Sequence, residues 1–368
     1  MNILINASNL HVGGGVQVAS SFLNELEKIL RVRNVNANIS VVVSTTVLDN
    51  LDYSFDKSVF DKFSELNIFG FDFRTRYKRN FFLGYDVIFT VFGPLYFHIK
   101  NTHEVTGFAQ PWIAYPDNLV YEKINILDRI KNRLNFYLKE IYFKKSSILI
   151  VEANHVKSSL VKLGYNKNNI KVVSNTISNV FFEDDWTPIN YKKSNKFTLG
   201  FIGRNYIHKN ISILKDVNLI LKRKYNTFCD FLFTLNDDEM INNGFDKFDN
   251  FYSVGEIKVE QCPSFYQQID ALIFPSLLEC FSAAPIEAMK MGKLVIASDL
   301  PFISDVCKSS ARYFDPLSAE SIALSIYKAI NEPEINEMMI MDAKNLVHHL
   351  PTAKDRAEAY LNILLNIK

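Results

Sequence analysis

The chain of 368 residues lacks the charge excess and the cysteine pattern that would place it in several common protein classes. Its formal net charge is only +1, so it has no global basic field that could hold nucleic acid non-specifically. The four cysteines are far apart and form no C-x-x-C pair. We therefore expect no nucleic-acid partner, no disulfide framework and a reducing compartment.

Long hydrophobic runs and a leader sequence are also missing. The chain begins with MNILINAS, which predicts a strand and not the basic-then-apolar pattern of a secretory signal. The apolar run over 87–99 is interrupted by Gly93-Pro94 and is too short to span a bilayer. No H-E-x-x-H motif or other metal-ligand spacing occurs, so we expect no metal and no bound cofactor. These observations predict a cytoplasmic protein.

Apolar residues make up 48% of the chain, and they form two alternating series of strands and helices. The first series predicts strands at 2–7, 39–44, 85–91, 104–108, 148–152 and 170–174, with helices at 16–30 and 155–163. The second predicts strands at 197–202, 230–235, 271–274 and 294–298, with helices at 214–225, 263–268 and 318–331. Such alternation is typical of doubly wound parallel sheets. A polar stretch over 183–195 predicts the linker between them.

We therefore expect an α/β protein with two Rossmann-like domains that face each other across a cleft. The predicted domains are 1–188 and 189–350, with 351–368 as a C-terminal helix that packs back toward the first domain. Ligands of such sheets bind beyond the carboxyl ends of the strands, and two facing domains make the cleft the default site.

The most informative segment is FPSLLECFSAAPIEAMKMG, over 274–292. It carries Glu279 after a predicted strand and Glu287 on the helix that follows, and the helix begins near Ser282, Ala283 and Ala284. A helix N-terminus attracts phosphate, and carboxylates accept hydrogen bonds from sugar hydroxyls. This combination suggests a sugar nucleotide as ligand.

Two further motifs lie at predicted strand ends. Gly203-Arg204 with Lys209-Asn210 follows the first strand of the second series and offers two cations for phosphate, although a solvated basic loop would have the same composition. Gly13-Gly14-Gly15 permits close backbone approach to a ligand, although a flexible turn is the simpler interpretation. The chain lacks the complete G-x-G-x-x-G pattern and the acidic residue of a dinucleotide site, which weakens an oxidoreductase interpretation.

Basic and aromatic residues alternate over 129–145 and, more briefly, over 74–82. Such stretches suit an anionic membrane surface. For the longer stretch, a crossover helix packed against the core is an equally good interpretation.

Together these motifs resemble the family-4 retaining glycosyltransferases of the GT-B fold. Glu279 and Glu287 match the family's E-x7-E pattern, Gly203 to Asn210 match G-R-x-x-x-x-K-N, and Gly13 to Gly15 match the N-terminal glycine loop. Within this family, the chain resembles the bacterial enzymes of O-antigen and capsular polysaccharide synthesis. The resemblance extends over nearly the whole chain.

The resemblance implies a role for each motif residue. Arg204 and Lys209 would hold the donor diphosphate, and Glu279 would contact the transferred sugar. Glu287 would bind the ribose hydroxyls. The backbone at Ser282, Ala283, Ala284, Gly14 and Gly15 would approach the donor.

The chain also departs from the family pattern. Cys280 and Ser282 stand where glycines are common, and Gln110 stands near the position of a family histidine. Gln110 is therefore a candidate for contact with the sugar or acceptor. His103 is a second candidate, because it lies near a predicted strand end of the first domain. The segment from Thr234 to Asp237 replaces a small glycine turn, which leaves recognition of the base open.

We therefore expect a metal-independent retaining glycosyltransferase that uses a nucleotide-diphosphate sugar, with UDP or GDP as the expected carrier. The expected acceptor is an oligosaccharide, linked to polyprenyl diphosphate, at the inner face of the cell membrane, in surface polysaccharide synthesis. Two alternatives remain open: a non-hydrolysing nucleotide-sugar epimerase or a phosphorylase, and a non-catalytic sugar- or nucleotide-binding protein.

Overall fold

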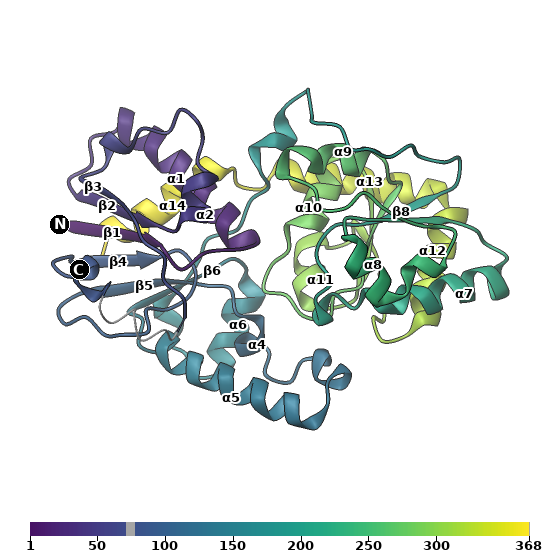
Figure 1. The fold of residues 1–368 in the computed structure, drawn as a ribbon, viewed down its shortest axis with the longest axis horizontal. Coiled ribbons are helices and arrows are strands. Elements are labelled where there is room, and N and C mark those ends of the chain that lie inside the picture. Colours follow the sequence, from purple (N-terminus) through teal and green to yellow (C-terminus); the bar gives the residue numbers. More distant parts are fainter. Residues whose placement is uncertain (71–77, 368) are drawn as a thin grey trace. The chain divides into compact units, whose positions relative to one another are not determined.

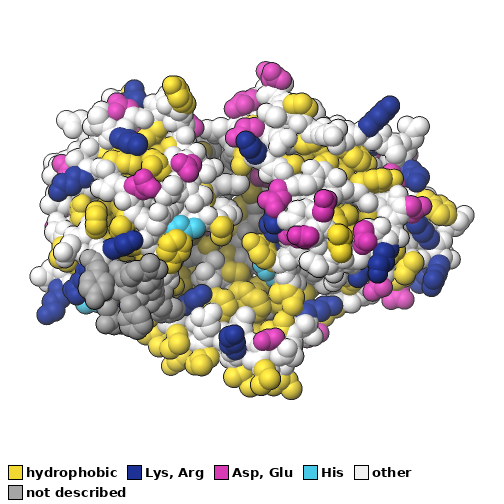
Figure 2. Space-filling model, in the orientation of Figure 1, with side chains coloured by type: hydrophobic (Ala, Val, Ile, Leu, Met, Phe, Trp, Pro, Cys, Tyr) yellow, Lys and Arg dark blue, Asp and Glu magenta, His cyan; other side chains and the backbone are white. Residues whose placement is uncertain are grey.

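The computed structural model describes residues 1–70 and 78–367, which fold into two compact units (Figure 1). Unit 1 comprises 1–116, 126–176 and 351–368, and unit 2 comprises 117–125 and 177–350. Charged side chains of both signs are scattered over the face in Figure 2, as a net charge near zero would suggest. Part of one predicted basic-aromatic stretch, 74–77, lies outside the described residues.

The core of unit 1 is a seven-stranded sheet in the order β3-β2-β1-β4-β5-β6-β7, with every neighbouring pair parallel. The strand order changes direction between β1 and β4, the position where doubly wound sheets bind ligands. The strands are β1 Asn2–Ala7, β2 Asn38–Val43, β3 Lys62–Glu65, β4 Val87–Thr90, β5 His103–Phe108, β6 Ile148–Val151 and β7 Ile170–Val172.

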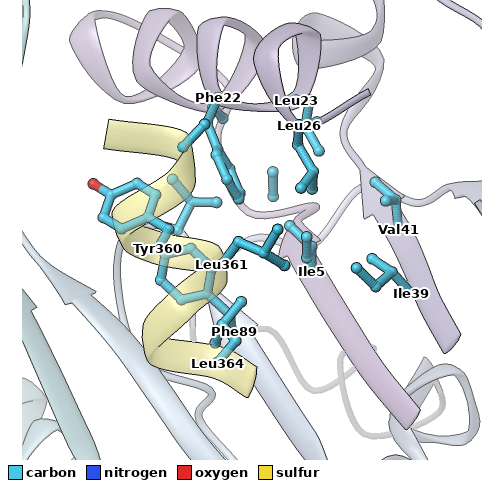
Figure 3. Close-up of a cluster of buried hydrophobic side chains, with 14 of the residues drawn as sticks. Ile5, Phe22, Leu23, Leu26, Ile39, Val41, Phe89, Tyr360, Leu361 and Leu364 are labelled. Atoms are coloured by element: carbon cyan, nitrogen blue, oxygen red, sulfur yellow. The ribbon is translucent and has the colours of Figure 1, made fainter. Parts of the chain in front are cut away.

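Helices α1 and α14 cover one face of this sheet (Figure 3). Along α1, Phe22, Leu23 and Leu26 project from one side and are fully buried, because apolar residues three and four apart share a helix face. Tyr360 of α14 meets Phe22 edge to face, with ring centroids 5.1 Å apart. The last helix therefore completes the core of unit 1. The helices of this unit are α1 Gly14–Val32, α2 Thr45–Asp49, α4 Pro111–Ala114, α5 Ile126–Phe143, α6 Asn154–Lys162 and α14 Ala353–Leu365.

Unit 2 contains a six-stranded sheet in the order β10-β9-β8-β11-β12-β13, again parallel throughout. Its direction changes between β8 and β11. The strands are β8 Thr198–Phe201, β9 Asp230–Phe233, β10 Phe251–Ser253, β11 Ala271–Phe274, β12 Leu294–Ser298 and β13 Ala311–Phe314. The helices are α7 Leu214–Tyr225, α8 Asp237–Asn243, α9 Cys262–Gln267, α10 Ala283–Lys290, α11 Pro301–Cys307, α12 Ala319–Asn331 and α13 Pro333–His348.

The two parallel sheets confirm the prediction of two doubly wound α/β domains. The sequence reading missed β3, β10 and β13, which are three or four residues long and lie at or near sheet edges. The division between the units also lies earlier than residue 188. Ile177, Val180 and Phe181 pack in a core of unit 2, so the chain enters this unit before the polar stretch begins.

Candidate active site

The predicted residues Arg204, Lys209 and Glu279 lie at the carboxyl ends of two adjacent strands of unit 2, β8 and β11. The loop after β8 carries Arg204 and Lys209, and the loop after β11 carries Glu279. The loop after β9 leads into α8 with Glu239. Because parallel strands end at the same edge of a sheet, residues far apart in the sequence converge at the change of direction between β8 and β11.

Lys209 and Glu279 form an ion pair at this edge. Lys209 Nζ lies 2.5 Å from Glu279 Oε1, and the two side chains are only 15% and 13% exposed. The ammonium group also lies 5.2 Å above the ring centre of Phe274, the last residue of β11. Asn210 holds the Lys209 segment in place by donating from Nδ2 to the carbonyl oxygen of Pro316, at 2.8 Å. The structure thus joins two predicted site residues that are 70 positions apart.

Neighbours of this pair that the sequence reading did not select include His208 and Ser276. The Ser276 hydroxyl donates to Glu279 Oε1 at 3.2 Å, and His208 Nε2 lies 4.0 Å from the same oxygen. Burial lowers the pKa of His208 below its usual value, so the imidazole is uncharged at neutral pH. His208 lies inside the Gly203–Asn210 motif, directly before Lys209, and this position is the sequence signal that could have identified it.

Arg204 points to carboxylates other than Glu279. Its Nε lies 3.2 Å from Glu239 Oε1, and Nη1 forms an ion pair with Glu256. Thr234 supports this loop, since its hydroxyl accepts from the Gly203 N–H at 3.0 Å. Asn236 caps α8 in a reciprocal pair with Glu239, which holds that carboxylate near Arg204. The segment that replaces the expected glycine turn therefore positions the partners of Arg204.

The start of α10 presents backbone N–H groups at the end of β11. Ser282 is the N-cap, but its side chain accepts no hydrogen bond from the helix. Ala283 and Ala284 form the first turn and are partly exposed, whereas Cys280 is buried. The first N–H groups of a helix have no intrahelical acceptor, so this turn offers donors to an anion.

Glu287 lies one turn further along α10, next to Tyr266 of α9. The Tyr266 hydroxyl lies 2.9 Å from Glu287 Oε2 and 3.1 Å from the Ala284 carbonyl oxygen. Loss of water around the carboxylate raises the pKa of Glu287 to about 7, although the hydrogen bond from Tyr266 opposes this shift. Burial also raises the pKa of Tyr266, which keeps its hydroxyl protonated as a donor. No sequence pattern marked Tyr266 as the partner of Glu287.

In unit 1, a cavity of about 240 Å³ lies where the strand order changes direction. Its lining comes from the loops after β1, β4 and β5, and from the segment that ends at Gly70. Gln110, a predicted contact residue, is part of this lining. Gly107 brings β5 close to the loop after β4, since a Cβ there would lie 1.7 Å from the Val91 carbonyl oxygen. The described lining residues are Asn6, Asn9, Leu10, Ile68, Gly70, Phe92, Gly93, Pro94, Leu95, Tyr96, Phe97, Ala109 and Gln110.

The predicted glycine loop lies next to this cavity, whereas His103 lies at the other end of β5. Gly13 caps α1 with a φ of 69°, and Gly14 and Gly15 begin that helix. A Cβ on Gly15 would lie 3.3 Å from Leu10, a residue of the cavity wall, so the glycine loop adjoins the cavity. His103 is the first residue of β5, at the opposite end of the strand from Gln110. The structure therefore does not bring His103 and Gln110 together.

In the described part of the chain, no three His, Cys, Asp or Glu side chains are grouped so that they could hold a metal ion. Within 1–70 and 78–367, no helix has both the length and the hydropathy needed to cross a bilayer.

Comparison with known proteins finds a family match in the second half of the chain. Residues 182–346 match the family model described as "Glycosyl transferases group 1". Over 195 residues, the chain is 25% identical to the O-antigen chain mannosyltransferase RfbU of Salmonella typhimurium. That match covers 49% of this chain, and the chain spans about half the length of this relative, 52%.

Solved structures share the whole fold. Sucrose-phosphate synthase from Thermosynechococcus elongatus has a TM-score of 0.70 at 14% identity, with 98% of this chain and 97% of that chain covered. Anabaena HepE, solved in complex with UDP-glucose, has a TM-score of 0.68 at 12% identity, with 100% and 99% covered. The fold is GT-B, which confirms the predicted fold class.

Proposed function

We propose that this protein is a retaining glycosyltransferase that moves a sugar from a UDP- or GDP-linked donor onto a lipid-linked oligosaccharide. The proposal places it at the cytoplasmic face of a membrane, in surface polysaccharide synthesis. The observation that carries it is the Lys209–Glu279 pair at the end of β8 and β11, beside the open first turn of α10. The match of 182–346 to the glycosyl transferases group 1 family supports the same assignment.

Lys209 is the cation that this proposal assigns to the leaving diphosphate. A largely buried ammonium group is worth more to a developing phosphate charge than an exposed one, because little water competes for it. Glu279 orients Lys209 through the 2.5 Å ion pair, and its carboxylate can also accept a hydrogen bond from a sugar hydroxyl. Arg204 provides a second cation once it exchanges its carboxylate partners for phosphate.

Glu287 is the proposed partner of the ribose. Among the residues that the structure describes, Tyr266 is its one hydrogen-bond partner, which leaves acceptor capacity on the carboxylate for two ribose hydroxyls. The first turn of α10, at Ala283 and Ala284, lies on the same helix and provides N–H donors for a phosphate. The ribose and phosphate groups of one nucleotide are also close together, so two successive turns of α10 can contact both.

The cavity of unit 1 is the proposed acceptor site. Amide side chains from Asn6, Asn9 and Gln110 line it together with aromatic rings, a combination that binds sugars through hydroxyl hydrogen bonds and stacking. None of its described lining residues is Lys, Arg, Asp or Glu. An uncharged sugar therefore fits this lining better than an acidic one.

Retention follows, in this proposal, from attack on the same face of the sugar from which the phosphate leaves. The acceptor hydroxyl forms the new bond to the anomeric carbon as the bond to phosphate breaks, and the departing phosphate oxygen takes the hydroxyl proton. Lys209 and Arg204 balance the charge that develops on the diphosphate. The expected reaction therefore persists when a chelator removes divalent metal ions.

A thermal-shift series with UDP, GDP, dTDP and CMP sugars tests the donor site. A ligand at 100 times its Kd adds about 2.7 kcal/mol to the stability of the folded state, so a true donor will raise Tm by several degrees. The best donor is then incubated with and without an oligosaccharide acceptor. Product with the anomeric configuration of the donor supports the proposal. An altered nucleotide sugar without acceptor indicates an epimerase, and binding without any turnover indicates a binding protein.

The carboxylates around Arg204 lead to a separate prediction. Replacing Glu256 with Gln removes one of the two ion-pair partners of Arg204 and frees the Arg204 guanidinium for the donor. Because exposed ion pairs are weak, we expect the donor KM to fall by about two- to fivefold with kcat little changed. Glu260→Gln on the same segment is the matched control, since Glu260 is exposed and lies outside this cluster. A higher KM in Glu256→Gln would instead indicate that Glu256 itself contacts the donor.

A further inference from the structure

Helix α5 (Ile126–Phe143) carries its large apolar side chains on the outside. Seven of them are between 39% and 79% exposed, and Phe143 is the only buried residue of the helix. The exposed residues are Ile126, Leu127, Ile130, Leu134, Tyr137, Leu138 and Ile141. Figure 2 shows hydrophobic side chains along the lower edge of this view, where Figure 1 labels α5. The alternative of a crossover helix packed into the core is therefore wrong for most of this helix.

The opposite side of α5 attaches the helix to unit 1. Phe136 stacks on Trp112 with ring centroids 5.7 Å apart, and Phe143 meets Phe108 of β5 at 4.8 Å. Lys139 lies over the Phe136 ring at 4.9 Å. A few aromatic contacts thus anchor the helix, and its broad apolar face stays uncovered. Surface helices of globular proteins normally have the reverse arrangement.

The exposed apolar face has the angular pattern of a helix that lies in a membrane interface. At 3.6 residues per turn, its seven residues fall within a sector of about 120°. The exposed side chains of Arg133 and Lys131 flank the two sides of this sector, and Lys144 and Lys145 follow the helix. Between Ile126 and Lys145 there are six basic and two acidic residues, a net charge of +4 on a chain whose total is +1. The positive charge is therefore concentrated beside the apolar face.

We propose that α5 lies flat in the headgroup region of an anionic lipid bilayer, with Ile130, Leu134 and Tyr137 directed into the acyl boundary. This extends the proposed function, in which the acceptor is carried on a lipid, by naming the element that reaches the lipid. Apolar burial and attraction between basic side chains and anionic headgroups act together in such helices. A second copy of the chain fits this face less well, because a symmetric contact would bring two clusters of +4 together.

Flotation of the full chain with phosphatidylcholine vesicles, with and without phosphatidylglycerol, tests this proposal. We expect binding only with phosphatidylglycerol, and weaker binding at high salt. Ile130→Gln with Leu134→Gln should lower the partition coefficient about tenfold or more, since these exposed side chains would lose their apolar contact with lipid. Lys131→Gln and Lys145→Gln should each lower it about fivefold.

The matched control is Met338→Gln with Met341→Gln on α13, which changes two exposed apolar residues of unit 2. Tyr137→Trp adds a direct readout, because brominated lipid should quench a tryptophan at an inserted position. Absence of vesicle binding, or equal binding by the Ile130/Leu134 variant, overturns the proposal. Self-association in solution that this variant abolishes, without vesicle binding, would assign the face to a second copy. Nucleotide-induced thermal shifts, measured without vesicles, report on the donor site independently of all these outcomes.

Discussion

Replacing Lys209 with Met lowers kcat for sugar transfer by about 10²–10³-fold, the usual effect of removing one preorganised charge from the site of a developing anion. The side chain is 15% exposed and lies 2.5 Å from Glu279 Oε1, so it is already held where the β8 and β11 loops meet. Its loss also leaves the Glu279 carboxylate without its ammonium partner, near the position proposed for the diphosphate. Steady-state rates with saturating donor and acceptor measure the effect.

Two further variants separate a catalytic from a structural effect of Lys209. Lys209→Met with Glu279→Gln removes both charges, so we expect it to recover most of the Tm lost in the single variant but none of the activity. Lys247→Met, in the 3-10 helix Phe245–Lys247, is the control for loss of an exposed lysine from unit 2. If the double variant recovers activity together with Tm, Lys209 acts through stability and not on the leaving group.

Donor affinity is expected to rise with pH through about 7, because the ionised form of Glu287 accepts hydrogen bonds from the ribose. Its pKa is raised to about 7 by burial, so the carboxyl group is largely protonated at pH 6 and largely ionised at pH 8. Below the pKa, affinity should fall about tenfold for each pH unit. Binding should also release protons near pH 7, which calorimetry in buffers of different ionisation enthalpy can measure. Glu287→Gln should bind weakly at every pH and show no such release.

The same shift predicts an opposite effect on stability. The folded-state pKa of Glu287 lies above its unfolded value of 4.5, so the unfolded state loses this proton first as pH rises. The free energy of unfolding should therefore decrease between about pH 4.5 and pH 7, by as much as about 3 kcal/mol, and stay level above that range. Glu287→Gln avoids this loss and should melt higher than the wild type at pH 8. Equal melting temperatures at pH 8 would show that Glu287 ionises without cost in the folded protein.

The positions of the strands along the chain could be predicted from the sequence more easily than the partners of the site residues. Strands β11 and β12 were predicted with their observed bounds, because continuous apolar runs are typical of parallel strands buried on both faces. Strand β10 was missed because three residues are too few to establish a pattern. Tyr266 and Glu256 were missed for a different reason. Their contacts depend on which loops and helices of unit 2 lie side by side, and that depends on the strand order of the folded sheet.

Helix α5 shows most clearly what periodicity leaves open. The spacing of Ile130, Leu134 and Tyr137 indicates an apolar face, but not whether that face lies against the protein. In the structure, Trp112 and Phe108 occupy the other side of the helix and leave this face exposed. The choice between a core helix and a membrane-surface helix for this stretch therefore depends on how its neighbours pack.

The sequence by itself determined two doubly wound α/β domains, because strand and helix patterns are local. Its short motifs also predicted a phosphate-and-hydroxyl site on the second domain. Only the tertiary structure decided that Lys209 meets Glu279, that Glu239 and Glu256 hold Arg204, and that Tyr266 meets Glu287. Each of these contacts joins residues from different loops or helices of unit 2. Such contacts follow from the order in which parallel strands pair, which is a property of the whole domain and not of any segment.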